Sequence, residues 1–249
     1  MTDGMIDESL LILSILIAVV AFLYSSVGHA GASGFIAVMS LMGLAPEDIR
    51  PTALTLNILV ATITFIQFYR VGYFSWQIFF PFAIFAVPLA FVGGNLDLPT
   101  EWFKRIVGCV LLFSAYRFFV RASEDPVATP CPNRVAFTVG GALGLLAGLT
   151  GTGGGIFLTP LLLWKRWAQV KEAAAVSALF ILCNSAAGLA GNIISTQTLP
   201  TTALPLAVAA VIGGTAGSYL GSNKLPTTAI KRLLAAVLVI AGLKLTMNW

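Results

Sequence analysis

Two glycine-rich stretches interrupt the apolar segments of this chain, one in each half. The first is Gly-His-Ala-Gly-Ala-Ser-Gly at residues 28–34, and the second is Gly-Leu-Thr-Gly-Thr-Gly-Gly-Gly at residues 148–155. Each follows a long apolar run and precedes one of about ten residues, which is too short to span a bilayer. Unwound backbone inside a bilayer is tolerated only where protein buries it or where it lines a cavity. Two such breaks therefore predict the binding site of a small transporter.

The composition agrees with a membrane protein. Of the 249 residues, 58% are hydrophobic and 10% are charged, and the mean hydropathy is +0.93. Soluble domains contain about 25% charged residues. The length allows roughly eight to ten spans. The first residues are acidic and carry no Lys or Arg, so we expect no cleavable signal peptide. The net charge of +4 comes from bases in short loops and predicts no nucleic-acid partner.

The two halves of the chain are related by a duplication. Residues 98–105 match residues 225–232 at an offset of 127, with five of eight positions identical. The same offset sets Asn57 opposite Asn184, whereas the glycine stretches align at an offset of 120. We therefore expect an all-α membrane protein made of two homologous repeats.

Each repeat should contain five apolar segments. In the first half the segments run about 10–27, 35–45, 52–69, 76–94 and 103–120, and in the second about 135–148, 156–164, 173–191, 200–220 and 229–247. Three prolines mark the connection between the halves. This predicts a first transmembrane repeat at 1–122, a connecting loop at 123–133 and a second repeat at 134–249.

The short second segment of each half allows two arrangements. It either folds back on the first segment as a hairpin, which inverts the repeats, or continues it as a broken helix, which keeps them parallel. Lys and Arg divide 4 to 10 between the two sides in the first arrangement and 5 to 9 in the second. The positive-inside rule mildly favours the inverted repeats, with the glycine breaks meeting near the midplane. Both divisions place the N-terminus outside.

The polar groups near the breaks suit a small anion. All ten acidic residues fall in termini, loops or segment ends, and no base falls within the core, so the usual ligand for a transported cation is missing. Free backbone N–H groups at helix starts could hold an anion, and glycine lets it approach closely. We expect no catalytic residue, no metal and no cofactor. The candidate substrate-binding residues are Gly28, His29, Gly31, Ser33, Gly34, Asn57, Thr150, Gly151, Thr152, Gly153, Gly154, Ser177 and Asn184.

Several of these residues have a structural alternative. His29 is the only side chain with an ordinary pKa near neutral pH and could handle protons, or it could simply bond a carbonyl group. Asn57 and Asn184 could bind substrate or join helices. Gly140 and Gly144 are expected to pack helices together, in contrast to the backbone role expected at the second break. Three widely spaced cysteines form no metal or disulfide pattern.

The second stretch also carries a family resemblance. Gly-Leu-Thr-Gly-Thr-Gly-Gly-Gly-Ile-Phe-Leu-Thr-Pro at residues 148–160 is similar to the motif of the sulfite exporter TauE/SafE family. The first stretch is a divergent copy, with His29 and Ser33 where small residues are usual. The resemblance covers essentially the whole chain. It implies a carrier of sulfite, sulfonates or related organosulfur anions in the bacterial inner membrane.

These observations together predict a multi-pass secondary carrier that exports a small sulfur-containing oxyanion. The alternatives are an anion-selective channel, which would show no coupling or saturation, and a carrier of a non-sulfur small organic anion. An enzyme is disfavoured because the chain has one His, no H-E-x-x-H or G-x-S-x-G motif and no intramembrane acid. The expected partners are the anion and the lipid bilayer, and the sequence leaves a homo-oligomer open.

Overall fold

Helices form the whole of the regular structure that the computed structural model describes, which covers residues 2–96, 112, 116, 129–197 and 203–246. No strand occurs in these residues, so the predicted all-α class is confirmed. The elements are α1 (Thr2–Ser26), α2 (Ala32–Leu41), α3 (Pro46–Arg70), α4 (Trp76–Gly94), α6 (Asn133–Thr150), α7 (Gly155–Trp164), α8 (Val170–Thr196), α9 (Ala203–Tyr219), the π-helix η1 (Leu220–Lys224) and α10 (Thr227–Thr246). These helices follow the predicted apolar segments in order. The segment at 103–120 lies outside the described residues except for positions 112 and 116.

Five helical stretches in the described part of the chain are long and apolar enough to cross a membrane. They are Glu8–Ser26, Glu47–Arg70, Trp76–Gly94, Val170–Thr196 and Ala203–Lys224. The helices α2 and α7 are apolar but have only 10 residues each. At about 1.5 Å per residue they cover roughly half of a bilayer core. The fold therefore combines full spans with two half-length helices.

Left-handed glycines separate each half-length helix from the helix before it. Gly28 and Gly31 have φ values of 84° and 118°, and Gly151 and Gly154 have values of 70° and 80°. Only glycine adopts this conformation without steric cost. The left-handed positions correspond at an offset of 123 residues. The alignment of the glycine stretches at an offset of 120 is therefore wrong by three residues, because it matched glycines by composition and not by their place in the turn.

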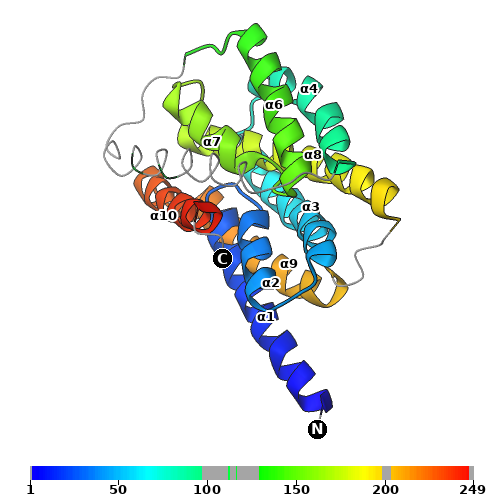
Figure 1. Ribbon diagram of the computed structural model, residues 1–249. Coiled ribbons are helices and arrows are strands. Elements are labelled where there is room, and N and C mark those ends of the chain that lie inside the picture. The colour runs from blue at the N-terminus through cyan, green and yellow to red at the C-terminus, as the bar shows by residue number, and fades with distance from the viewer. Residues whose placement is uncertain (1, 97–111, 113–115, 117–128, 198–202, 247–249) are drawn as a thin grey trace.

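The two half-length helices leave their breaks differently (Figure 1). A Cβ built on Gly34 would lie 2.5 Å from Val20 Cγ1 and 3.2 Å from Tyr24 Cε2, so α2 turns back along α1. In contrast, α7 diverges from α6 and packs against α8. The first half thus forms a hairpin, one of the two arrangements that the sequence allowed, whereas in the second half α7 points away from α6.

Close glycine contacts join α4 to α6. A Cβ on Gly144 would lie only 2.1 Å from the carbonyl oxygen of Ala86, and Gly140 and Gly148 are equally tight one turn away on either side. The order of the contacts along both helices shows that α4 and α6 run parallel. The prediction that Gly140 and Gly144 pack helices together is confirmed.

The same arrangement joins α9 to α1. A Cβ on Gly213 would lie 2.0 Å from the carbonyl oxygen of Ala18, and one on Gly217 would lie 2.1 Å from that of Phe22. Hence α4 and α9, the fourth helix of each half, each pack against the first helix of the other half. The predicted repeats at 1–122 and 134–249 therefore interlock.

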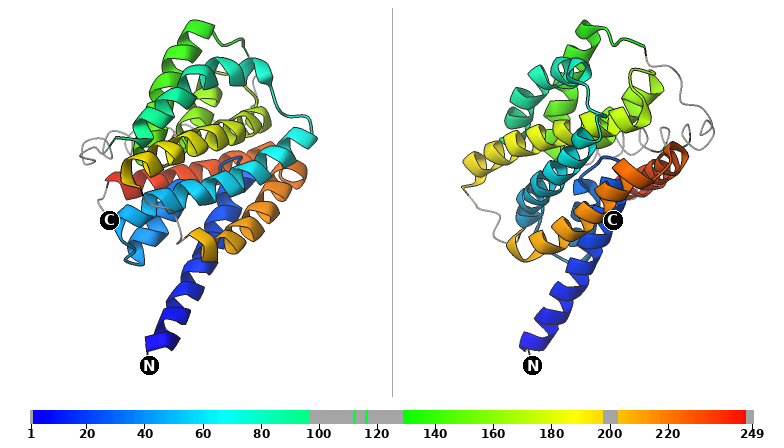
Figure 2. Two further views of the ribbon diagram at one scale, coloured as in Figure 1. Left: turned by 90° about the vertical axis from the view of Figure 1, so that its right-hand side faces the viewer. Right: turned by 180° about the vertical axis from the view of Figure 1, so that it is seen from behind.

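The helices α3 and α8 form the centre of the molecule and run antiparallel (Figure 2, left). Leu54 lies near Gly188, at 3.8 Å from a Cβ built there, whereas Phe68 packs with Ala174. The residue numbers of the contacts rise along α3 as they fall along α8, so the two helices are antiparallel. Most of the residues on α8 from 173 to 181 are buried alanines and larger apolar side chains, which places this pair in the interior.

Candidate functional site

One buried asparagine on α3 connects the two glycine breaks. Asn57 Oδ1 accepts a hydrogen bond of 3.0 Å from the backbone N–H of Ala32, the first residue of α2. Its Nδ2 donates to the carbonyl oxygen of Thr152 at 3.3 Å and to Ser185 Oγ at 3.2 Å. The side chain is fully buried. The site is therefore assembled from both halves of the chain, around a single amide whose hydrogen-bonding groups are used.

The asparagine on α8 differs from Asn57 in its hydrogen bonding. Asn184 is fully buried, yet neither its Oδ1 nor its Nδ2 has a hydrogen-bond partner among the described residues. It lies one turn from Phe180, whose Cε1 would be 3.0 Å from a Cβ on Gly154, and one turn from Gly188, which contacts Gly148. Helical spacing thus turns Asn184 toward the second break. An unpaired buried amide costs about 1–3 kcal/mol, so this position is costly to the folded state.

His29 belongs to a separate chain of hydrogen bonds. Its Nε2 lies 2.8 Å from Thr159 Oγ1 on α7, and the Thr159 hydroxyl donates to Ser177 Oγ on α8 at 2.6 Å. All three side chains are buried. Because the Thr159 oxygen then accepts from the His29 Nε2–H, a neutral ring leaves a lone pair on Nδ1. Nδ1 makes no hydrogen bond of good geometry and would not attract an anion.

The remaining candidate hydroxyls bond within their own half. Ser33 Oγ donates to the Tyr24 hydroxyl at 2.9 Å. Thr150 Oγ1 donates to the carbonyl oxygen of Leu146 and lies 2.8 Å from Thr152 Oγ1. The structure thus gathers Asn57, Thr152 and Ser185 at one centre, with Gly153 beside them, since a Cβ there would lie 2.8 Å from Asn57 Nδ2.

Arg50 is a residue of the site that the sequence analysis missed. Its Nη2 donates to the carbonyl oxygens of Gly93 at 2.8 Å and Gly148 at 2.6 Å, at the C-terminal ends of α4 and α6. A Cβ on Gly151 would lie 3.0 Å from Arg50 Cγ. Arg50 precedes Asn57 by seven residues, or about 10 Å along α3. The sequence analysis expected no base within the core; Arg50 lies near the start of α3, but its side chain reaches the second break.

The acidic residues and two of the cysteines can be located in the structure. The acidic residues that it describes all lie within the first two turns of a helix: Asp3, Asp7, Glu8, Glu47, Asp48 and Glu172. In the described residues no three His, Cys, Asp or Glu side chains gather as metal ligands. Cys131 and Cys183 are free thiols.

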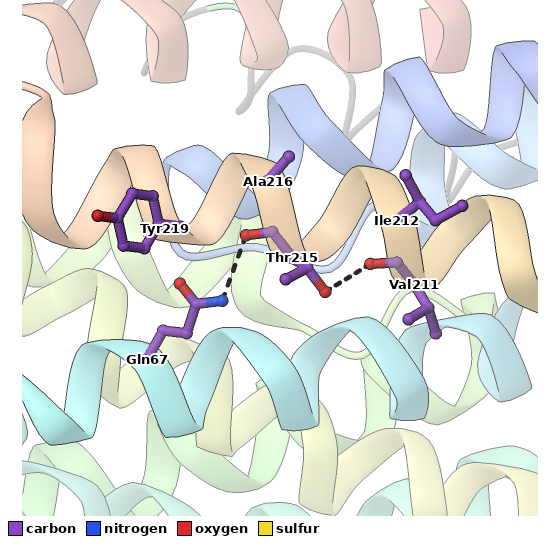
Figure 3. A pocket seen from close by; sticks show the side chains of 6 residues that line it. All are labelled: Gln67, Val211, Ile212, Thr215, Ala216 and Tyr219. Atoms are coloured by element: carbon purple, nitrogen blue, oxygen red, sulfur yellow. Dashed lines mark hydrogen bonds between the residues drawn. The ribbon is translucent and has the colours of Figure 1, made fainter.

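A shallow pocket between α3 and α9 lies apart from the breaks (Figure 3). It faces outward, because Ile212 and Tyr219 on its rim are 64% and 50% exposed. Gln67 Nε2 donates to the carbonyl oxygen of Thr215 across it at 3.2 Å. Gln67 follows Asn57 by ten residues, or about 15 Å along α3. This apolar surface therefore fits contact with lipid rather than with the substrate.

Apolar spanning helices around a buried polar centre define a multi-pass membrane transporter, and comparison with known proteins agrees. The family model described as sulfite exporter TauE/SafE matches residues 13–245. The chain is also 38% identical over 244 residues to "Probable membrane transporter protein y4hK" of Sinorhizobium fredii (strain NBRC 101917 / NGR234), covering 96% of this chain and 99% of the relative. No solved structure matches significantly. The chain belongs to the TauE/SafE sulfite exporter family and is a transporter rather than an enzyme.

Proposed function

We propose that this protein is a secondary carrier that exports a small sulfur-containing oxyanion, such as sulfite or a sulfonate, across the bacterial inner membrane. The description of its family supports the sulfur chemistry. The observation that carries the proposal is the buried, unpartnered amide of Asn184, which faces the glycine-rich second break. An anion with several acceptor oxygens would accept hydrogen bonds from the Nδ2 group of this amide, and so offset part of the cost of burying it.

Backbone donors at the start of α7 complement the amide. Gly154 is the N-cap residue and has no side chain to cap the helix, and among the described residues no side chain accepts from the N–H groups of Gly155 and Ile156. The start of a helix carries partial positive charge, and the glycines let a ligand reach the backbone. A compact oxyanion accepts many such bonds at once, so it should bind better than chloride.

The surrounding charges also favour an anion over a cation. The guanidinium of Arg50 packs beside the second break, whereas the acidic residues that the structure describes are confined to the first turns of helices. In a low-dielectric interior a fixed positive charge nearby raises the affinity for an anion substantially. Its field would oppose a cation at the same place.

We also propose that the two repeats are inverted. The helices α3 and α8 are the third helices of their halves and run antiparallel, as repeats related by an axis in the membrane plane require. Asn57 is the twelfth of 25 residues in α3, and Asn184 is the fifteenth of 27 in α8. Mid-helix positions support breaks near the midplane. The distribution of Lys and Arg then supports an external N-terminus.

Counterflow in proteoliposomes tests the proposed carrier. Vesicles loaded with unlabelled sulfite should take up labelled sulfite transiently above equilibrium, with saturation, and a small sulfonate outside should compete. A channel would show neither saturation nor counterflow. Stronger competition by a carboxylate of similar size than by the sulfonate would indicate a non-sulfur organic anion. Faster flux of a monovalent metal cation than of any oxyanion would refute the proposal.

A further inference from the structure

We infer that the anion binds at the second glycine break only, between Asn184 and the start of α7, and that the first break is closed by Asn57. This inference rests on the proposed function and places the substrate within it. It predicts different roles for two asparagines that occupy corresponding places in the two repeats.

The donors of the first break are already used. The N–H of Ala32, which starts α2, donates to Asn57 Oδ1 at 3.0 Å. The hydroxyl of Ser33 bonds to Tyr24. An anion entering here would have to displace protein hydrogen bonds, which costs as much as the new bonds supply.

The second break retains the donors that the first has used. At the offset of 123 residues, Ala32 and Ser33 correspond to Gly155 and Ile156. The N-cap residue of α7, Gly154, has no side chain to cap the first turn, and among the described residues no side chain accepts from the N–H of Gly155 or Ile156 as Asn57 accepts from Ala32. The amide of Asn184 faces this break, and neither of its polar atoms has a partner among the described residues. A helix start and a buried, unpartnered amide are thus directed at the same place.

The two breaks also differ in the charge beside them, and the positive charge lies at the second break. Gly151 packs against the side chain of Arg50, whereas the corresponding Gly28 packs against Ala174, whose Cβ would be 2.3 Å from an added Cβ. Arg50 donates to carbonyl oxygens at the ends of α4 and α6. It is therefore a positioning residue that acts on the anion through its field, without contacting it.

The thermal stability and the sulfite affinity of the variants, measured together, distinguish an asparagine that binds the anion from one that closes a break. Leucine is branched at Cγ like asparagine, with two larger methyl groups in place of the amide oxygen and nitrogen, and it has no polar atoms. Asn184→Leu removes an unpaired buried amide, so it should raise the thermal midpoint while weakening sulfite binding at least about tenfold, or about 1.4 kcal/mol. Asn57→Leu leaves the N–H of Ala32 without its acceptor, so it should lower the thermal midpoint. Both quantities are measurable on the purified full chain, by thermal unfolding and by titration calorimetry with sulfite.

A charge variant keeps the test decisive if Asn57→Leu does not fold. Asn184→Asp should weaken sulfite binding by about a hundredfold or more, because it places a carboxyl group at the anion. Arg50→Lys should retain much of the affinity that Arg50→Gln loses. The inference fails if Asn184→Asp or Asn184→Leu binds sulfite as tightly as the wild type, or if Asn184→Leu is less stable. If the wild-type protein neither binds nor exchanges any oxyanion, the proposed function itself fails.

Discussion

The contact between α4 and α6 gives the sharpest prediction about stability. Gly144 and Gly141 are both buried on α6, but they face different neighbours. A Cβ on Gly144 would lie 2.1 Å from Ala86 O and 2.4 Å from Ala86 Cα, which are backbone atoms of a packed helix. A Cβ on Gly141 would lie 3.0 Å from Leu89 Cδ1, the end of a flexible side chain. Alanine at Gly144 must separate the helices, whereas alanine at Gly141 needs only a small rotation of Leu89.

The expected magnitude follows from these distances. Because the added Cβ meets backbone atoms that cannot rotate away, we expect overpacking at the upper end of the usual range, about 3 kcal/mol, of which the better helix propensity of alanine returns about 1 kcal/mol. A net loss of about 2 kcal/mol would lower the thermal midpoint of a chain of this size by roughly 4–8 °C. For Gly141→Ala the propensity gain offsets the small clash, so the midpoint should change little.

Heating of the detergent-purified variants, followed by size-exclusion chromatography of the remaining folded protein, measures both midpoints. A Gly144→Ala protein as stable as the wild type would refute the close packing of α4 on α6. An equal loss in the Gly141→Ala protein would show that any added methyl group on α6 is harmful, and would remove the specific role of Gly144.

Three further predictions concern other parts of the molecule. Gly217→Ala should also lower the thermal midpoint, because its Cβ would lie 2.1 Å from Phe22 O on α1; an unchanged midpoint would contradict the parallel contact of α1 with α9. His29→Gln should keep the pH profile of sulfite counterflow, because the His29 ring bonds Thr159 and, when neutral, presents no donor to an anion. A flatter profile in the variant would indicate that His29 handles protons or substrate. Burial raises the pKa of the Cys131 thiol to about 11. Its alkylation by a maleimide, in a chain without the other two cysteines, should therefore still accelerate between pH 8 and 10, and a plateau below pH 9 would contradict the burial.

The helices were predictable because apolar runs are long and their ends are marked by glycine and proline. The packing role of Gly140 and Gly144 was also predictable, since glycines spaced by four residues let two backbones approach. The role expected at Gly153 and Gly154 was substrate approach with little effect on folding. Both adopt positive φ, at 72° and 80°, so alanine there should strain the backbone as well.

Arg50 was missed because the apolar run that contains Asn57 begins only at residue 52. The helix begins earlier, at Pro46, which occupies a first-turn position that suits proline. Arg50 therefore lies on α3, two turns before Asn57 and on the same face. The spacing of seven residues was the signal available in the sequence, once the start of the helix was known.

The difference between the two asparagines could not be predicted from the duplication. Alignment sets Asn57 and Asn184 opposite each other and suggests equal roles. The hydrogen bonds of Asn57 depend on Ala32 and Thr152, which belong to different breaks. Which break approaches which asparagine is set by the packing of the whole fold, and by the divergence of α7 from α6.

The central claim is that a small oxyanion binds between Asn184 and the start of α7. A structure determined with selenite, the heavier analogue of sulfite, tests it most directly, because selenium can be located by anomalous scattering. The account predicts one selenium peak, placed so that the selenite oxygens accept hydrogen bonds from Asn184 Nδ2 and from the first N–H groups of α7, and its loss in Asn184→Asp. A peak at the start of α2, beside Ala32, or none at either break at saturating selenite, would contradict it.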